Sequence, residues 1–357
     1  MFELFAAIRF ALWKQEDESL KHANWRVLLS EAREHAVLGL AFNAMEHYVS
    51  QTDDKMMLYE NIALVEEIKR ANTRTNNCMG ELINILKRQN IDYRVFKGQV
   101  VASCYPDPTI RQSGDIDIWV PTDKQKAFRD IIEETLSQDI KRYGSEIHIE
   151  FEWHGVPIEV HQRLTSFVRK RHQDYFNQLL NTDEGMVVMV DGNEVKTLNP
   201  TLNALYIFIH LFFHLVTEGV GLRQLCDWMM WLHKYNGVIN REKLEEYLQV
   251  LGLTKAYRVI GTILVDYLGL PKSEFPLEIT ENDSKKSKKV LNDIMANGNF
   301  GHKKTLIHDV GFLHSCQTFY KMICQGFKHA GLAPLEVPFY VPQRIFWYYR
   351  KMLLKLP

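Results

Sequence analysis

Two aspartates that stand two residues apart are the residues of this sequence best suited to chemistry. Asp115 and Asp117 lie in the run RQSGDIDIWV, whose alternation of polar and apolar residues is typical of a half-buried strand. Side chains at i and i+2 of a strand point to the same face, and two carboxylates that close repel each other unless a cation lies between them. A divalent metal, with triphosphate oxygens at its open positions, is the simplest arrangement. The alternative is a solvent-exposed acidic face, because this pattern also arises by chance.

The neighbours of this pair favour the metal interpretation. Lys97 and Gly98 follow a predicted strand at 91–96, and a glycine there lets the backbone approach a phosphate. Glu159 stands alone among apolar residues in the strand pattern at 156–161, so it can supply a third acid from a neighbouring strand. The three acids together predict a two-metal site, in which one metal orients a triphosphate and the other activates an attacking hydroxyl.

Several segments together resemble the uncharacterised nucleotidyltransferase family of the DNA polymerase beta-like superfamily. They are KG at 97–98, YPDPTIRQSGDIDIWV, IEVHQRL, and the helical run LNPTLNALYIFIHLFFHLVTEGVGLRQLCDWMMWLHK. The resemblance covers residues 91–233. It implies a small mixed sheet with flanking helices and an active site on its face, with Mg²⁺ or Mn²⁺ as cofactor. The catalytic and metal-binding acids that it implies are Asp115, Asp117 and Glu159.

The phosphate-binding turn departs from the superfamily pattern. Lys97 and Gly98 occupy the place of the superfamily's Gly-Ser turn, and a glutamine follows where a Ser hydroxyl would contact the triphosphate. A lysine can compensate by presenting a cation to the phosphates. The predicted nucleotide- and phosphate-binding residues are Lys97, Gly98, Arg111, Ser113 and Gly114. Two simpler interpretations stay open: Lys97 as a surface lysine, and Arg111 as a partner of Asp115 or Asp107.

Further candidates for the acceptor side of the cleft are His161, His210, His214, Arg223 and Asp227. His210 and His214 have the i, i+4 spacing of zinc hydrolases, but no Glu follows His210. Hydrogen-bonded histidines on a buried helix are therefore the favoured interpretation, and one histidine facing the cleft is an intermediate one. Arg223 and Asp227 have the spacing of an ion pair within a helix. His161, two residues after the third acid, either lines the site or flanks it.

The elements that must position these residues fall into three segments. Residues 1–90 have helical spacing, with a long helix at 55–88 that ends near Asn90. Residues 91–196 mix strand and helix patterns, and residues 197–357 are helical. The sequence predicts an α+β fold, in which a small mixed-sheet nucleotidyltransferase core lies between N-terminal helices and a C-terminal helical domain. Within the core we expect strands at 91–96 and 115–120, a helix at 123–137, a hairpin of 145–153 with 156–161, and a β pair at 186–196.

Composition bounds the partners and the compartment. The 357 residues carry 43 Lys and Arg against 44 Asp and Glu, a formal net charge of −1. A protein that coats nucleic acid normally has a basic excess, so we expect no long nucleic acid as a partner. The five cysteines show no CxxC spacing, which argues against a disulfide framework or a structural zinc site. We expect a cytoplasmic protein.

Three apolar or basic segments bear on membrane contact. The N-terminal run MFELFAAIRFALW is expected to form an amphipathic helix and not a signal peptide. The apolar stretch at 204–216 is too short to cross a bilayer. The basic-aromatic C-terminus VPFYVPQRIFWYYRKMLLKLP is expected to dock on the protein's own surface or on a partner, and not on a membrane. The run KKSKK at 285–289 is expected to be a solvated helix face or loop.

These observations lead to one favoured function and two alternatives. The favoured function is Mg²⁺-dependent transfer of a nucleoside monophosphate from an NTP to a hydroxyl of a small molecule or protein, with release of pyrophosphate. The first alternative is a catalytically impaired nucleotide-binding or regulatory protein on the same fold. The complete acid triad favours the enzyme, because a chain freed from catalysis has no evident need for all three acids. The weaker alternative is a metal-dependent hydrolase that uses His210 and His214.

Overall fold

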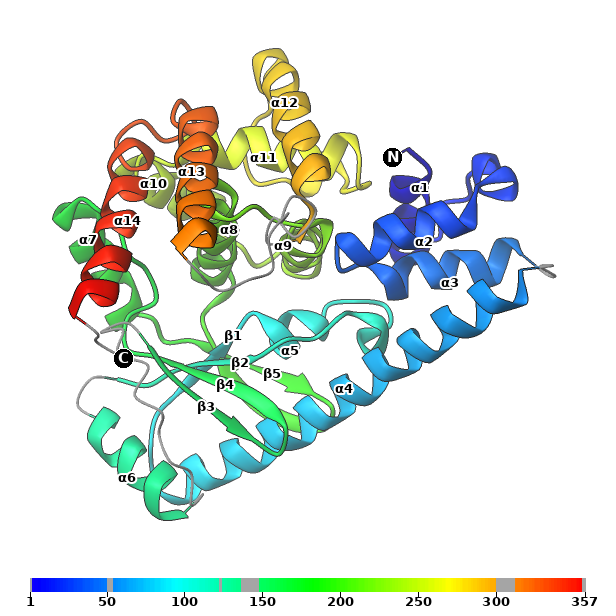
Figure 1. Cartoon of the computed structure of the whole chain (residues 1–357). Helices are drawn as coiled ribbons and strands as arrows, with labels where there is room; N and C mark the ends of the chain where they lie inside the picture. Colours follow the sequence, from blue (N-terminus) through cyan, green and yellow to red (C-terminus); the bar gives the residue numbers. More distant parts are fainter. Residues whose placement is uncertain (1, 50–53, 122–123, 136–147, 300–311, 355–357) are drawn as a thin grey trace.

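The computed structural model describes residues 2–49, 54–121, 124–135, 148–299 and 312–354 (Figure 1). Helices come first in the chain, a small sheet follows, and helices return after it, so the predicted α+β class is confirmed. In Figure 1 the long helix α4, Lys55–Arg88, runs along one side of the sheet, and the C-terminal helices lie on the opposite side. Buried side chains of all three predicted segments form one continuous hydrophobic cluster. The division of the chain into three domains stays a prediction.

The N-terminal helices are α1 (Phe2–Trp13), α2 (Trp25–Glu34), α3 (Leu38–Tyr48) and α4. The expectation that α1 is amphipathic is wrong, because its side chains from Leu4 to Leu12 are nearly all buried. The Trp13 indole donates to the Leu268 carbonyl at 2.7 Å, which ties α1 to the C-terminal helices as well as to α3. The end of α4 is as predicted: Asn90, at a φ of +52°, turns the chain out of the helix.

The central sheet is mixed, with strand order β1-β2-β4-β3. Its strands are β1 (Arg94–Phe96), β2 (Ile116–Trp119), β3 (His148–Trp153) and β4 (Val156–His161). β2 is antiparallel to β1 and parallel to β4, and this register places Asp117 opposite Glu159. The two acids are 42 positions apart in sequence numbering (159 − 117) but adjacent across the sheet.

Two hairpins have the predicted turns. His154 and Gly155 join β3 to β4, and Asp191 and Gly192 join β5 (Met186–Val190) to β6 (Asn193–Thr197). All four turn residues have φ values between +46° and +77°, as a two-residue turn between twisted strands requires. The helix predicted at 123–137 is α6, Gln125–Thr135. Residues 123, 136–137 and 145–147 of the predicted elements lie outside the described part of the chain.

The remaining helices are α5, between β1 and β2, and those that follow β4 in the chain. Their bounds are α5 Gly98–Ala102, α7 Lys170–Asn181, α8 Pro200–Thr217, α9 Leu222–Lys234, α10 Arg241–Val250, α11 Thr254–Asp266, α12 Glu281–Asn297, α13 Phe312–His329 and α14 Val337–Leu354. α8 has 18 residues and is long and apolar enough to cross a membrane, which corrects the expectation that this stretch is too short. However, 83% of α8 is buried inside the protein, as in the core helix of a globular fold.

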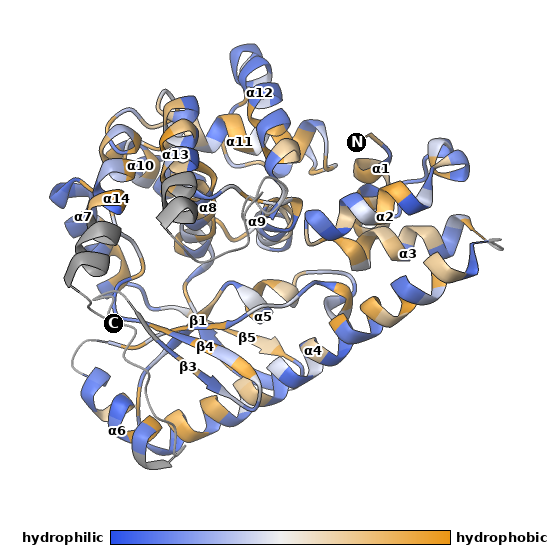
Figure 2. Cartoon of the chain, in the orientation of Figure 1, coloured by the Kyte–Doolittle hydropathy of each residue, from blue (hydrophilic) through white to orange (hydrophobic). Residues whose placement is uncertain are grey.

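Two outer helices carry the remaining basic runs. α12, largely hydrophilic in Figure 2, carries KKSKK, and Lys285 and Lys289 are exposed on it, which confirms the solvated face. α14 lies against α8, where the Tyr340 ring stacks on Phe213 with 4.4 Å between centroids. Over its first turns the C-terminal segment therefore docks on the protein itself. Its side chains after Phe346 lie outside the described residues.

Candidate active site

A cavity of about 490 Å³ lies between the face of the sheet and helices α8, α9 and α14. Its walls include twelve of the predicted site residues: Lys97, Gly98, Arg111, Gly114, Asp115, Asp117, Glu159, His161, His210, His214, Arg223 and Asp227. Ser113 lies in the loop before β2 but is not among the lining residues. The sequence-derived candidates, which span more than a hundred positions, therefore converge on one cavity.

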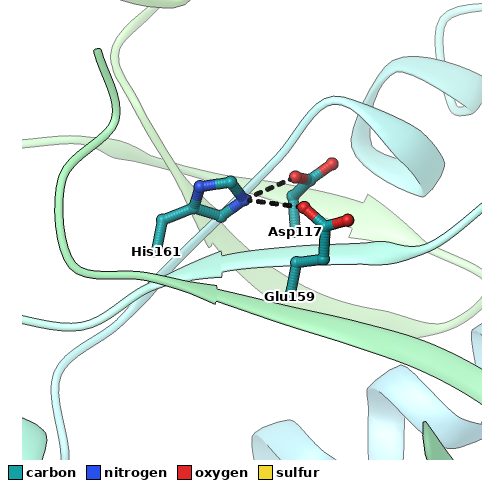
Figure 3. Close-up of side chains that lie close together, drawn as sticks. All are labelled: Asp117, Glu159 and His161. Carbon is teal, nitrogen blue, oxygen red and sulfur yellow. Dashed lines mark hydrogen bonds and ion pairs between the residues drawn. The ribbon is translucent and has the colours of Figure 1, made fainter. Parts of the chain in front are cut away.

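The floor of this cavity is formed by acids on β2 and β4. Asp117 is 3% exposed, and the Nε2 atom of His161 lies 2.7 Å from its Oδ1 atom (Figure 3). The same Nε2 atom lies 3.5 Å from Oε2 of Glu159. Asp115 precedes β2, and its carboxylate hydrogen-bonds to that of Glu159. His161, which the sequence left as either lining or flanking, lines the site.

The electrostatic surroundings shift the pKa values of two of these acids in opposite directions. Burial favours the neutral form of Asp117, but the Lys97 charge and the His161 hydrogen bond outweigh it and lower the pKa of Asp117 to about 2. Burial and the charges of Asp115 and Asp117 raise the pKa of Glu159 to about 8. Without a metal, Asp117 is therefore ionised at neutral pH, while Glu159 holds a proton.

The donor set of the floor fits a divalent metal. Asp117, Glu159 and His161 offer three ligand atoms that all lie within 4.8 Å of one another. Carboxylate oxygens suit Mg²⁺ and Mn²⁺, and an imidazole nitrogen adds a ligand that transition metals accept more readily than Mg²⁺. After burial, the negative charges of Asp115 and Asp117 are the main causes of the raised pKa of Glu159. A bound cation would offset this repulsion between the acids.

Lys97 is held over the acids by an unusual backbone. It follows β1 directly, at a φ of +56°, a conformation that costs a residue with a side chain roughly 1–3 kcal/mol. Its side chain is only 15% exposed, so the surface-lysine interpretation is wrong. Burial lowers the pKa of Lys97, but the carboxylates of Asp117 and Asp115 outweigh it, and the net pKa is raised. Gly98, at a φ of +37°, lets the chain pass close to Asp115: a Cβ at Gly98 would lie 3.3 Å from the Asp115 carbonyl oxygen.

Arg111 has a partner that the sequence did not indicate. Its Nε and Nη2 atoms donate to the two carboxylate oxygens of Asp227 at 2.7 and 2.8 Å, so neither Asp115 nor Asp107 is its ion-pair partner. The Arg223–Asp227 ion pair predicted from helical spacing is therefore wrong. Arg223 instead donates from Nη1 to the Gln112 carbonyl at 3.0 Å. The reason is tertiary packing. α9 packs beside the loop before β2, and Arg111 in that loop is better placed than Arg223 to pair with Asp227.

The two helix histidines line the cavity, and the metal-capable group of the described residues does not include them. His210 lies 3.4 Å, through Nδ1, from Nζ of Lys97. Burial and this neighbouring cation hold the pKa of His210 well below its usual range, so the ring is neutral. His214 Nδ1 lies 3.2 Å from Oε2 of Glu218. Hydrogen-bonded histidines that face the cleft therefore fit better than a zinc site.

Sequence reasoning missed several cavity residues. Arg163, Thr165 and Ser166 follow β4, and the first of them stands in the IEVHQRL run that had already drawn attention. Tyr340 and Arg344 come from α14. No local pattern could place them here, because their position depends on how the C-terminal helix folds back over α8.

A small mixed sheet that presents paired aspartates and a third acid to a cavity is the arrangement expected of a nucleotidyltransferase. Residues 21–269 match the uncharacterised nucleotidyltransferase family, and the chain belongs to that family. The match confirms the resemblance noted for residues 91–233 and extends it over the N-terminal helices. The protein is accordingly classed as a nucleotidyltransferase.

Solved structures give more distant likenesses. The antibiotic-resistance factor ANT(2'')-Ia is 11% identical with a TM-score of 0.37, over 54% of this chain and 96% of that one. An antigenic nucleotidyltransferase-like protein from Paracoccidioides brasiliensis is 15% identical with a TM-score of 0.35, over 56% of this chain and 93% of that one. No curated protein matches the sequence.

Proposed function

We propose that the protein transfers a nucleoside monophosphate from an NTP to a hydroxyl group of a small molecule or protein, in a reaction that depends on Mg²⁺ or Mn²⁺. The observation that carries this proposal is the cluster of Asp115, Asp117 and Glu159 on the floor of the cavity, with Lys97 beside it. The near-zero net charge supports an acceptor other than a long nucleic acid.

In the proposed reaction the acceptor oxygen forms a bond to the α-phosphorus, and the bond from that phosphorus to the β-phosphate oxygen breaks. Asp115, Asp117 and Glu159 would hold the metal, which when bound neutralises phosphate charge and activates the hydroxyl. Glu159 loses its own proton when the metal binds, and its carboxylate on β4 would then accept the hydroxyl proton. Lys97 and the backbone around Gly98 and Gly114 contact the phosphates, and pyrophosphate leaves.

The acceptor occupies the opposite end of the cavity in this proposal. Thr165 and Ser166 after β4, together with Glu218 and Arg344, line the cavity with hydrogen-bonding and charged groups that this end would use. Polar walls of both charge signs suit a hydroxyl-bearing acceptor better than an apolar one.

One observation favours the alternative of nucleotide binding without transfer. Nζ of Lys97 and Nε2 of His161 both lie within 2.8 Å of Oδ1 of Asp117, an oxygen that a metal would need. If Lys97 stays there when nucleotide binds, metal-dependent transfer is impaired.

The deciding experiment incubates the purified chain with each NTP labelled at the α-phosphate, Mg²⁺ or Mn²⁺, and lysate of the native host. Transfer of label by the parent, but not by Asp115→Asn, supports the enzyme and identifies base and acceptor. Tight nucleotide binding without transfer supports the alternative. If a parallel incubation with NTP labelled at the γ-phosphate labels the acceptor and the α-labelled NTP does not, the proposed bond cleavage is contradicted.

A further inference from the structure

Two buried arginines lie in the wall of the cavity, where α9 meets the loop before β2. The guanidinium groups of Arg111 and Arg223 lie there near the carboxylates of Asp227 and Asp115, whose charges act on both. Arg111 engages both oxygens of Asp227, and the Tyr105 hydroxyl donates to one of them at 2.7 Å. Asp227 is thus committed to Arg111, and Arg223 donates to the Gln112 carbonyl instead of to that carboxylate.

Both arginines also have donor atoms without partners. Arg111 is only 4% exposed, yet its Nη1 atom makes no hydrogen bond within the part of the chain that is described. The same holds for the buried Nε atom of Arg223. Unsatisfied buried donors are costly. Because both side chains line the cavity, an anion inside it can satisfy them.

The position of the pair limits the kind of anion. Gly114 lies beside the pair, since a Cβ there would lie 3.9 Å from Nη1 of Arg223. Asp115 follows directly, and its charge acts on both guanidiniums as well as on Glu159. A ligand that runs from the acid cluster to both arginines must be extended and carry negative charge at its far end.

We propose that Arg111 and Arg223 form the subsite for the β- and γ-phosphates of the NTP, with Asp227 as the positioning residue that aims Arg111. This inference rests on the proposed function and deepens it. Guanidinium groups match phosphate oxygens with paired, directed donors. The α-phosphate stays at the acids, and the arginines hold the pyrophosphate that leaves. The subsite makes the enzyme selective for triphosphates over monophosphates.

The test is calorimetric titration of the full chain with Mg²⁺-pyrophosphate, which carries no base and is the proposed product. Removing Arg111 would strand Asp227 without its partner, so the decisive variant is Arg223→Gln, which leaves that ion pair intact. It should weaken pyrophosphate binding about tenfold or more. Arg111→Lys keeps the charge but lacks the fork of donors, so it should weaken binding as well. Arg74→Gln, which removes an exposed charge on α4 outside the cavity, should leave the affinity unchanged.

The outcomes separate this inference from the proposed function. Undiminished pyrophosphate affinity in Arg223→Gln, or no binding by the parent chain, overturns the subsite even if labelled monophosphate is transferred. Inorganic phosphate bound as tightly as pyrophosphate also overturns it, because the site then takes a single phosphate. Pyrophosphate binding that depends on Arg223, in a chain that transfers no label, keeps the subsite and removes the proposed function.

Discussion

Nζ of Lys97 lies 2.8 Å from Oδ1 of Asp117, so the most buried acid of the candidate site is already paired with a cation. The lysine directly follows β1, which is the sheet neighbour of β2, and the aspartate lies within β2. Glycine would adopt the positive φ of Lys97 at no cost. The turn alone would favour glycine. The presence of a lysine in that conformation therefore indicates that the contacts of its side chain are required.

We expect Lys97→Met to destabilise the fold by about 3 kcal/mol, because it leaves the Asp117 carboxylate buried with His161 as its side-chain hydrogen-bond partner and without the lysine charge. Urea denaturation of parent and variant measures this difference. The matched control is Lys196→Met, since Lys196 and Asp92 form an ion pair of the same 2.8 Å length with 46% and 42% exposure. An exposed pair contributes about 0–1 kcal/mol. Equal losses in the two variants would contradict the structural importance of the buried pair.

Asp115→Asn and Asp117→Asn should each abolish Mg²⁺-dependent NTP binding, because each removes a charge that would hold the metal in the proposed reaction. Calorimetry with and without Mg²⁺ measures the effect, and circular dichroism confirms folding. Glu152→Gln is the control, since Glu152 is exposed on β3 and does not line the cavity. Parent-like affinity in both aspartate variants would refute the metal assignment.

Glu159→Gln should reduce turnover more than nucleotide affinity. The glutamine keeps the size of the side chain but cannot accept the hydroxyl proton, and general-base catalysis typically contributes about 10²–10⁴-fold to the rate. Single-turnover transfer and calorimetric NTP binding, measured on the same preparation, separate the two effects. Undiminished turnover would remove Glu159 from the chemistry.

The local patterns of the sequence predicted most of the elements around the site. The alternation in β3 and β4, the two glycine-containing turns and the stop at Asn90 depend on neighbouring residues alone. The third acid could also be recognised, because a lone glutamate in an apolar strand is unusual.

Partnerships across the fold could not be predicted in this way. Arg111 and Asp227 are 116 residues apart, and the helical spacing of Asp227 pointed to Arg223 instead. Helix periodicity reports only what one helix can reach on its own surface. The burial of α1 was missed for a related reason, since a helix covered on several sides depends on packing that its own sequence does not specify.

Acid should weaken the contact between α12 and α13 through Asp293. Burial raises the pKa of this carboxyl, but hydrogen bonds from His329, Lys328 and Gln325 outweigh it, so its net pKa is lowered. A carboxylate with a depressed native pKa stabilises the fold above its unfolded pKa of about 3.9 and loses that contribution as the pH falls through the native value. The stability gap between the parent and Asp293→Asn should therefore be widest near neutral pH and shrink below about pH 4. A gap that does not change with pH would show that the charge of Asp293 contributes nothing.

The proposed acceptor side of the cavity includes a residue of the C-terminal helix. Arg344 lines the cavity from α14, and its charge acts on Glu218 at the end of α8. We expect Arg344→Gln to raise the KM of the acceptor about tenfold, the effect of losing one charged hydrogen bond, while the KM of the NTP stays within about twofold. Steady-state kinetics with each substrate varied in turn measures both constants once the acceptor is known, and Arg74→Gln again controls for net charge. If the KM of the NTP rises instead, Arg344 belongs to the nucleotide end of the cavity, and the proposed orientation of the two substrates is reversed.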